Sequence, residues 1–118
     1  MSARRSKSQG PAKTIAQSAS LFAALGDRTR LQLVTRLGSE GPLSIARLTD
    51  GTDVSRQAVS KHLQVLEEAG LARGVRRGRE RLWQLEAAKL ELARRSIERI
   101  SRRWDEALER LRATVEDP

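Results

Sequence analysis

The segment of residues 55–69 carries the side chains whose chemistry is easiest to interpret. On a helical wheel turning about 100° per residue, its apolar side chains gather on one side and polar ones on the opposite side. The polar side comprises Arg56, Gln57, Ser60, Lys61 and Gln64. In the major groove of DNA, arginine suits guanine edges and glutamine suits adenine edges, while serine and lysine suit phosphate oxygens. We therefore expect Arg56 and Gln57 to read bases, and Ser60 and Lys61 to contact phosphates.

Positive charge is concentrated in two short segments. The net charge is +8, and residues 73–81 hold five arginines against one glutamate, while residues 1–13 hold four basic residues and no acidic one. Focused basic patches favour a polyanionic partner. In the first patch, the side chains expected to contact DNA are Arg76, Arg77 and Arg79. This patch follows residues 55–69 closely, which argues against the alternative that the polar helix face is only a solvated surface.

Two helices are expected before this region. From Thr14, apolar residues recur at three- and four-residue steps until Gly26, at Ile15, Ala19, Phe22 and Leu25. This periodicity predicts a first helix over residues 14–25. A second helix is expected to begin after the N-cap Asp27 and to end at Gly38. The side chains expected to face inward from the second helix are Leu31, Val34 and Leu37.

A helix-turn-helix is expected next. A short strand at Leu43 and a short helix capped by Ser44 are followed by a polar turn at residues 50–53. A longer helix, capped by Ser55, then runs to about Ala69. This arrangement would present the polar face of residues 55–69 to a DNA groove.

A β-hairpin is expected directly after these helices. Two runs of alternating residues over residues 71–85 surround Gly78, which is typical of a hairpin and its turn. A hairpin placed there is a wing, so the expected fold is mainly α (α+β), a winged helix-turn-helix. Residues 14–86 would form the DNA-binding domain. Residues 1–13 would form a basic flexible arm, which either solubilises the chain or lies along DNA.

The final segment, residues 87–118, predicts one long helix that mediates dimerisation. It would be about 45 Å long, and its apolar stripe is too long to be buried against so small a domain. We expect its first part to pack on its own domain and the rest to pack on a second copy of the chain. The residues expected at the dimer interface are Leu90, Ile97, Ile100, Trp104, Leu108 and Leu111.

Composition excludes several kinds of site. The chain has no cysteine and a single histidine, His62, so neither a thiolate zinc site nor a closed histidine site can form, and no cofactor is expected. His62 lies on the apolar side of its helix and is expected to be a hydrogen-bonded core residue. The usual catalytic nucleophiles and bases are nearly absent, so an enzyme is not expected.

Other classes of protein are disfavoured for similar reasons. Only three aromatic residues are present, which makes a poor stacking platform for single-stranded nucleic acid. No apolar run approaches the roughly 18 residues of a membrane helix, and no signal peptide is recognised. We therefore expect a cytoplasmic protein that does not bind membranes.

The expected helices and hairpin contain four sequence motifs. They are LGDRTRL at residues 25–31, SRQAVSKHL at 55–63, LEEAGL at 66–71 and RRGR at 76–79. Together they resemble the ArsR family of winged-helix repressors, over residues 21–85. The resemblance implies a homodimer that sits on operator DNA, represses transcription and, in many members, releases DNA when an effector binds. It places the recognition contacts at Arg56, Gln57, Ser60 and Lys61.

The chain departs from the family at both of the family's metal sites. One site uses cysteines in the short helix before the turn, where this chain reads LSIARL at residues 43–48. The other uses histidine and acidic residues on the last helix, and residues 86–118 contain no histidine. The sequence therefore resembles the branch of the family that lacks the metal-binding motifs, with an unidentified small-molecule effector that could sit between the first and last helices.

Two functions remain open on the sequence. The first is a sequence-specific regulator of double-stranded DNA, a homodimeric repressor that does not sense metal and binds an inverted-repeat operator. The alternative is a winged-helix module for protein–protein contact or for non-specific, architectural DNA binding. The mixture of arginine, glutamine and serine on residues 55–69 favours the first, since lysine alone would suffice for non-specific binding.

Overall fold

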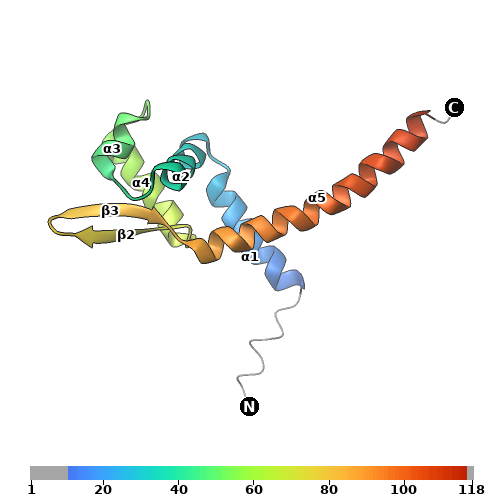
Figure 1. Cartoon of the computed structure of the whole chain (residues 1–118), viewed down its shortest axis with the longest axis horizontal. Helices are drawn as coiled ribbons and strands as arrows, with labels where there is room; N and C mark the ends of the chain where they lie inside the picture. The colour runs from blue at the N-terminus through green and yellow to red at the C-terminus, as the bar shows by residue number, and fades with distance from the viewer. Residues whose placement is uncertain (1–10, 117–118) are drawn as a thin grey trace, which may run out of the picture.

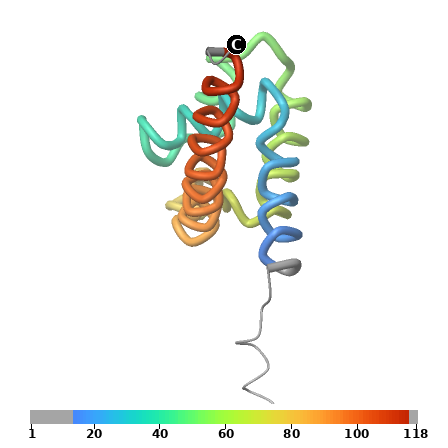
Figure 2. The backbone as a smooth tube through the Cα atoms, turned by 90° about the vertical axis from the view of Figure 1, so that its right-hand side faces the viewer, coloured from blue at the N-terminus to red at the C-terminus, as the bar shows by residue number. Residues whose placement is uncertain are grey.

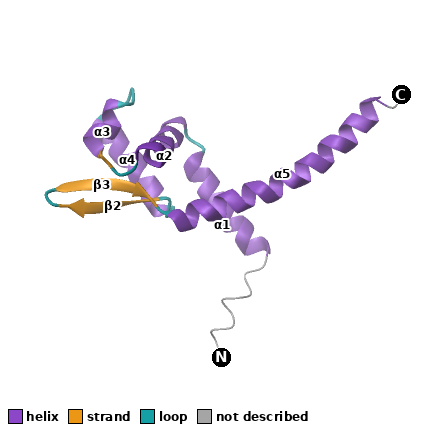
Figure 3. Cartoon of the chain, in the orientation of Figure 1, coloured by secondary structure: helices purple, strands orange, loops and turns teal. Residues whose placement is uncertain are grey.

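The computed structural model describes residues 11–116, and the side chains of residues 14–115. Its elements in order are α1 (Pro11–Leu25), α2 (Arg28–Glu40), β1 (Leu43–Ser44), α3 (Ile45–Asp50), α4 (Arg56–Glu68), β2 (Ala72–Arg77), β3 (Glu80–Leu85) and α5 (Ala87–Glu116). Figures 1 and 3 show α3, α4 and the hairpin at one end of the molecule, while α5 extends away from the other. The expected mainly α winged helix-turn-helix is confirmed.

The expected N-caps start the helices of this domain. The side chains of Asp27, Ser44 and Ser55 each accept a hydrogen bond from the backbone N–H three residues further along the chain. Such bonds satisfy one of the backbone donors that a helix start leaves without an intrahelical partner. The starts of α2, α3 and α4 are therefore determined locally, by one side chain each.

Helix α1 begins at Pro11, earlier than the expected start at Thr14. Proline suits the first position of a helix, because its φ is already helical and its missing N–H would have no partner there. The expected arm is therefore shortened by three residues, and its remainder, residues 1–10, lies outside the described residues.

Helix α2 continues past Gly38, so the expected end at that residue is wrong. The helix runs to Glu40 and is capped by Gly41, which has φ of 82°. An ion pair between Arg36 and Glu40, one turn apart, spans Gly38 and supports the helix there. Gly41 has a positive φ, which glycine adopts readily because it has no Cβ, and the helix ends there.

A three-stranded antiparallel sheet in the order β1–β3–β2 forms the wing and its base. The hairpin closes through Gly78 and Arg79, and only Gly78 of this pair has positive φ, at 65°. Glycine at the first central position is the pattern of a type II′ turn, whose twist matches that of the flanking strands. Trp83 on β3 is buried opposite Leu43 of β1, which anchors the wing to the domain.

One hydrophobic core joins the helices to the sheet. The fully buried side chains at its centre are Leu33, Val59, Leu48, Leu63, Leu66 and Leu71. They come from α2, α3, α4 and the segment between α4 and β2. The face of α4 opposite its polar side chains therefore lies in the middle of the core.

The inward face expected for α2 is partly wrong. Leu33 is buried with 0% of its surface exposed, whereas Leu31 is 52% exposed; Leu37 is buried and Val34 packs against the core, as expected. Arg30, next to Leu31, is directed to the protein, because its Nε donates a hydrogen bond to the backbone oxygen of Ala24. Arg30 therefore faces the protein, while Leu31, which was expected to do so, faces the solvent.

Helices α1 and α5 lie side by side (Figure 2). Ser18 of α1 and Ser96 of α5 are both buried, and their hydroxyl groups are 2.5 Å apart in a hydrogen bond. Small residues such as these and Ala93 allow the two helices to approach closely. Beyond this contact α5 leaves the domain, and its apolar side chains are exposed, with Trp104 at 66% and Leu111 at 61%.

No helix within residues 11–116 is long and apolar enough to span a membrane.

Two leucines on α2 provide a matched test of this packing. Leu33→Ala should lower the free energy of unfolding by about 2–5 kcal/mol, because it leaves a cavity in the core. Leu31→Ala should change it by about 0.5 kcal/mol or less, because its side chain is largely in solvent. Urea denaturation at one fixed protein concentration measures both. Equal losses in the two variants would contradict the assignment of the buried face.

Candidate nucleic-acid interface

Helix α4 presents the five polar side chains expected to bind DNA on its outer face. Arg56, Gln57, Lys61 and Gln64 are exposed, and Ser60 is half-buried. The opposite face carries three leucine or valine side chains with 0% exposure. Within residues 14–115, neither Arg56 nor Lys61 takes part in an ion pair. The structure therefore brings these side chains together on one surface and leaves their charges available to a partner.

The turn between α3 and α4 is held by hydrogen bonds of Thr52. Its hydroxyl donates to the backbone oxygen of Thr49 at 3.1 Å and accepts from the backbone N–H of Val54 at 3.4 Å. These bonds tie the end of α3 to the start of α4. They hold the angle between the two helices, which decides how α4 would enter a groove.

Arg36 of α2 fixes the other side of this motif. Its Nη1 donates to the backbone oxygens of Arg47, at 3.0 Å, and of Leu48, at 3.2 Å, while its Nε donates to Glu40. The last carbonyl groups of a helix have no partner within the helix, and a guanidinium satisfies two of them here. No local pattern in the sequence indicates this role of Arg36, because the carbonyl groups it binds lie 11 and 12 residues away.

A cluster of Asp27, Arg30 and His62 connects α4 to the junction of α1 and α2. Arg30 Nε donates to the oxygen of Ala24 at 2.6 Å, and its Nη1 donates to His62 Nδ1 at 3.2 Å. His62 Nδ1 also lies 3.7 Å from a carboxylate oxygen of Asp27. His62 is hydrogen-bonded, as expected, but it lies at the edge of the core with 23% of its side chain exposed.

The carboxylate of Asp27 is stabilised in its charged form. Its pKa is lowered from the usual 3.8, chiefly by the hydrogen bond from the backbone N–H of Arg30, with smaller contributions from the charges of His62 and Arg30. Partial burial acts in the opposite direction. The same carboxylate therefore caps α2 and faces the histidine of α4.

The wing separates its arginines into two groups. Arg81 lies 4.5 Å above the ring of Trp83 and 3.7 Å from Glu67, and Arg73 pairs with Glu86, so both are engaged by the protein. The expected DNA-contacting residues Arg76, Arg77 and Arg79 are exposed, and no ion pair holds them within residues 14–115. The tip of the wing is therefore a patch of unneutralised positive charge.

The second surface of interest is the far half of α5. On a wheel of about 100° per residue, Ile97, Ile100, Trp104, Leu108, Leu111 and Val115 lie within about 40° of Trp104. All six are exposed. Leu90, the other residue expected at the dimer interface, is half-buried and packs against the core of its own chain. The apolar stripe that needs a partner therefore begins at Ile97.

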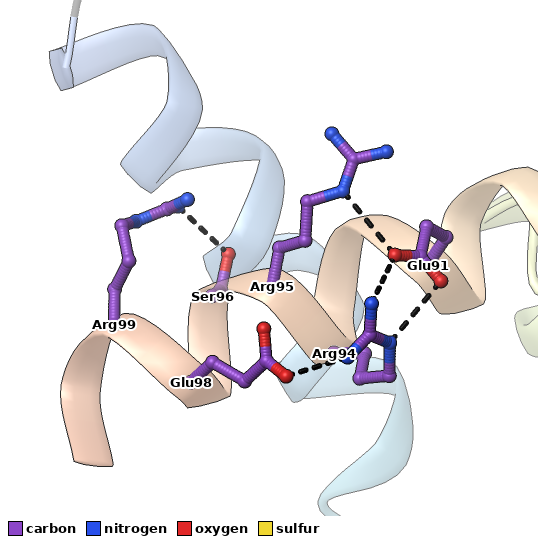
Figure 4. A network of polar contacts seen from close by, with 6 residues as sticks. All are labelled: Glu91, Arg94, Arg95, Ser96, Glu98 and Arg99. Carbon is purple, nitrogen blue, oxygen red and sulfur yellow. Dashed lines mark hydrogen bonds and ion pairs between the residues drawn. The ribbon is translucent and has the colours of Figure 1, made fainter. Parts of the chain in front are cut away.

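Ion pairs cover another face of α5 (Figure 4). Arg94 bonds with Glu91 and Glu98, and Arg95 bonds with Glu91. The hydrogen bond from Arg94 lowers the pKa of Glu91, and the pKa of Arg94 is raised in turn. Pairs at this spacing support a solvent-exposed helix.

The described residues contain no group of three or more His, Cys, Asp or Glu side chains that could hold a metal ion. Ser44 of the LSIARL stretch caps α3.

The chain is similar to known regulators along most of its length. Residues 25–75 match a family model described as a helix-turn-helix domain. The HTH-type transcriptional regulator Rv2034 of Mycobacterium tuberculosis is 40% identical over 85 residues, covering 72% of this chain and 76% of the relative. An ArsR-like transcriptional regulator from Rhodococcus sp. RHA1 has 39% identity and a TM-score of 0.68, covering 89% of this chain and 98% of that one.

The chain belongs to the ArsR family of winged helix-turn-helix transcriptional regulators.

A further solved relative bears on the assembly of ArsR-family chains. The homodimeric winged helix-turn-helix DNA-binding domain Mb0332 from Mycobacterium bovis has 26% identity and a TM-score of 0.61. The match covers 87% of this chain and 94% of that one. The resemblance to the ArsR family seen in the sequence is thus confirmed, and at least one structural relative is described as a dimer.

The contribution of Asp27 to the free energy of unfolding should depend on pH. Because its pKa is lower in the folded protein, it stabilises the fold above about pH 3.8, and this stabilisation is lost as the pH falls through the folded-state value. Asp27→Ala should therefore be less stable than the parent protein near neutral pH, with the difference narrowing in acid. Chemical denaturation between pH 7 and pH 3 measures the difference.

Asp53, exposed in the turn before α4, provides the control. Asp53→Ala should show no comparable narrowing of the stability difference in acid. A difference for Asp27→Ala that stays constant or grows as the pH falls would show that its charge does not matter.

Proposed function

We propose that this ArsR-family chain is a homodimeric repressor that binds an inverted-repeat operator in double-stranded DNA. The observation that carries the proposal is that α4, with its exposed polar side chains, and the wing, with arginines that form no ion pair within the described residues, lie at the same end of the molecule (Figure 1). Two donor-rich surfaces next to each other suit a groove and the backbone that borders it.

Helix α4 enters the major groove with its N-terminal end toward the bases. Arg56 and Gln57 stand in its first turn and are exposed, so they reach guanine and adenine edges. Lys61 and the half-buried Ser60 lie further back and contact phosphates, and Gln64 extends the same face. The phosphate contacts hold the register in which the two leading side chains read sequence.

The wing reaches the backbone or the minor groove beside this site. Arg77 and Arg79 flank the Gly78 turn, and Arg76 stands one residue before them. No ion pair within the described residues holds these arginines, so they can neutralise DNA phosphates. Neutralising phosphates releases counterions from the DNA, and this release is the main source of their contribution to the binding free energy. This contribution is independent of sequence.

The exposed stripe of α5 joins two copies of the chain. Trp104, 66% exposed, stands at the centre of six apolar side chains on one helix face, and such a stripe is stable in water only when another surface covers it. A two-fold axis through this contact gives the dimer two α4 helices, and binding in successive major grooves on one side of the duplex requires them to lie about 34 Å apart. The description of the Mycobacterium bovis relative as homodimeric supports this assembly.

In this proposal the repressor does not sense metal ions. It acts in the cytoplasm, where the DNA is. The family's two metal sites lack their ligands in this sequence, which has no cysteine and whose single histidine is engaged with Arg30.

Base-reading and backbone-contacting arginines should behave differently. Arg56→Ala should relax base preference and cost about 1–3 kcal/mol at one base pair per half-site. Arg77→Ala combined with Arg79→Ala should weaken binding to all duplexes alike and flatten the dependence of log affinity on log salt by roughly 0.9 per lost contact. Selection from a random duplex pool, followed by titrations at several salt concentrations, measures both effects.

Arg110→Ala, on the far half of α5, is the matched control and should change neither quantity. If the dependence of log affinity on log salt is unchanged in the double wing variant, the wing does not contact DNA. Tight binding by the parent protein without any enriched sequence would favour architectural binding, and no binding would favour a winged helix that contacts proteins.

The dimer contact can be tested at Trp104. Trp104→Asp should shift the protein from dimer to monomer at micromolar concentration, because it puts a charge at the centre of an apolar contact. Most operator affinity should be lost with it, since a monomer contacts one half-site. Sedimentation analysis and operator titration measure the two effects. Arg102→Asp, nearly opposite Trp104 on the wheel, should remain dimeric, and a parent protein that is already monomeric would contradict the assembly.

A further inference from the structure

A groove of about 680 Å³ runs between α1 and α5. Its walls are largely apolar and include Ile15, Phe22 and Ile100, and its lining also contains the hydrogen-bonded pair of Ser18 and Ser96. The volume lies within the range of about 300–1,000 Å³ that is usual for sites that hold small organic ligands. Figure 2 shows the two helices that form it, side by side.

Two arginines of α5, Arg99 and Arg103, also line this groove. Within residues 14–115 neither forms an ion pair, and Arg99 instead donates a 3.3 Å hydrogen bond to Ser96 Oγ. Arg94 and Arg95, one turn earlier on α5, are neutralised by glutamates (Figure 4). Helix α1, which forms the opposite wall, contains no acidic residue. The groove therefore combines apolar walls with two positive charges that no carboxylate of its lining balances.

We propose that this groove binds an amphipathic organic anion, namely a carboxylate carried on an apolar body. The carboxylate pairs with the guanidinium groups of Arg99 and Arg103, whose planar geometry suits two-point hydrogen bonding. The apolar body lies against Ile15, Phe22 and Ile100. An uncharged apolar molecule would leave both arginines unpaired, and a small inorganic anion would leave the apolar walls in water.

The position of the groove strengthens this assignment. On the helical wheel, Arg103 lies about 60° beyond Ile100, next to the edge of the apolar stripe that is proposed to join two copies of the chain, whereas Arg99 lies about 140° from Trp104. A second copy seated on the stripe would remove water from the neighbourhood of Arg103, and a poorly solvated charge without a partner is costly. A bound anion supplies that partner. Whether the ligand alters DNA affinity rests on the proposed function, whereas its binding does not.

Decanoate is a suitable probe, because it joins a carboxylate to an unbranched apolar chain. Isothermal titration of the full-length protein, without DNA, should show decanoate binding about tenfold more tightly than 1-decanol, which lacks the charge, and acetate should not bind measurably. Arg99→Gln combined with Arg103→Gln should weaken decanoate binding by about tenfold. Arg102→Gln, on the same turn of α5 but outside the groove lining, should leave it unchanged.

Three results would overturn the inference. Equal affinity for decanoate and 1-decanol would show an apolar surface without charge recognition. Decanoate binding that survives the double substitution would place the ligand elsewhere. Absence of decanoate binding to a protein that sediments as a dimer would show that side chains of the second copy fill the groove. The comparison of decanoate, 1-decanol and acetate uses the parent protein alone. It therefore tests whether both the carboxylate and the apolar chain are recognised, even where a variant folds poorly.

Operator titrations on the same preparations separate this inference from the proposed function. Intact operator binding without decanoate binding overturns the ligand site alone. Arginine-dependent decanoate binding without operator binding overturns the proposed function alone and supports the site. When both hold, a change in operator affinity on adding decanoate, absent in the double variant, identifies the groove as the effector site.

Discussion

The rest of the structure depends on the burial of one face of α4. Val59, Leu63 and Leu66 are fully buried, and they meet Leu33 of α2 and Leu48 of α3 in a single small core. A chain of this length supports only one such core, so the same packing that stabilises the domain also fixes the direction in which α4 points its polar side chains. The stability of the domain and the presentation of the face proposed to bind DNA therefore depend on the same packing.

Polar contacts at the edges of this core set the finer geometry. Arg36 caps the end of α3, Thr52 closes the turn, and Arg30 links the α1–α2 junction to His62 of α4. Each contact occupies a backbone or ring atom that would otherwise lack a partner near the core. The Arg30–His62 bond reaches α4 itself, while the bonds of Thr52 and Arg36 hold the turn and the helix that precede it.

The molecule separates its tasks along its length. Helix α4 and the wing lie at one end, and the far half of α5, with its exposed apolar side chains, extends from the other (Figure 1). The groove is lined by residues of α1 and of the part of α5 that packs on it. The groove touches α1, whose last turn accepts the hydrogen bond of Arg30, and Arg30 in turn bonds with α4. A ligand between α1 and α5 would thus act on a continuous set of packed and hydrogen-bonded groups that reaches the DNA-binding helix.

The sequence by itself determined the features that depend on local chemistry. The caps at Asp27, Ser44 and Ser55, the hairpin around Gly78, the polar and apolar sides of α4 and the long C-terminal helix all follow from residue type and periodicity, and the structure contains each of them. Only the tertiary structure decided which of two neighbouring residues turns inward, as with Leu31 and Leu33, since a polar anchor at Arg30 shifted the buried face of α2. It also packed Leu90 against the core of its own chain, brought Arg36 to carbonyl groups distant in sequence, and placed Arg99 and Arg103 beside the apolar face of α1. These outcomes depend on how helices pack against one another, and helical periodicity within one segment carries no information about the surface that another segment will present to it.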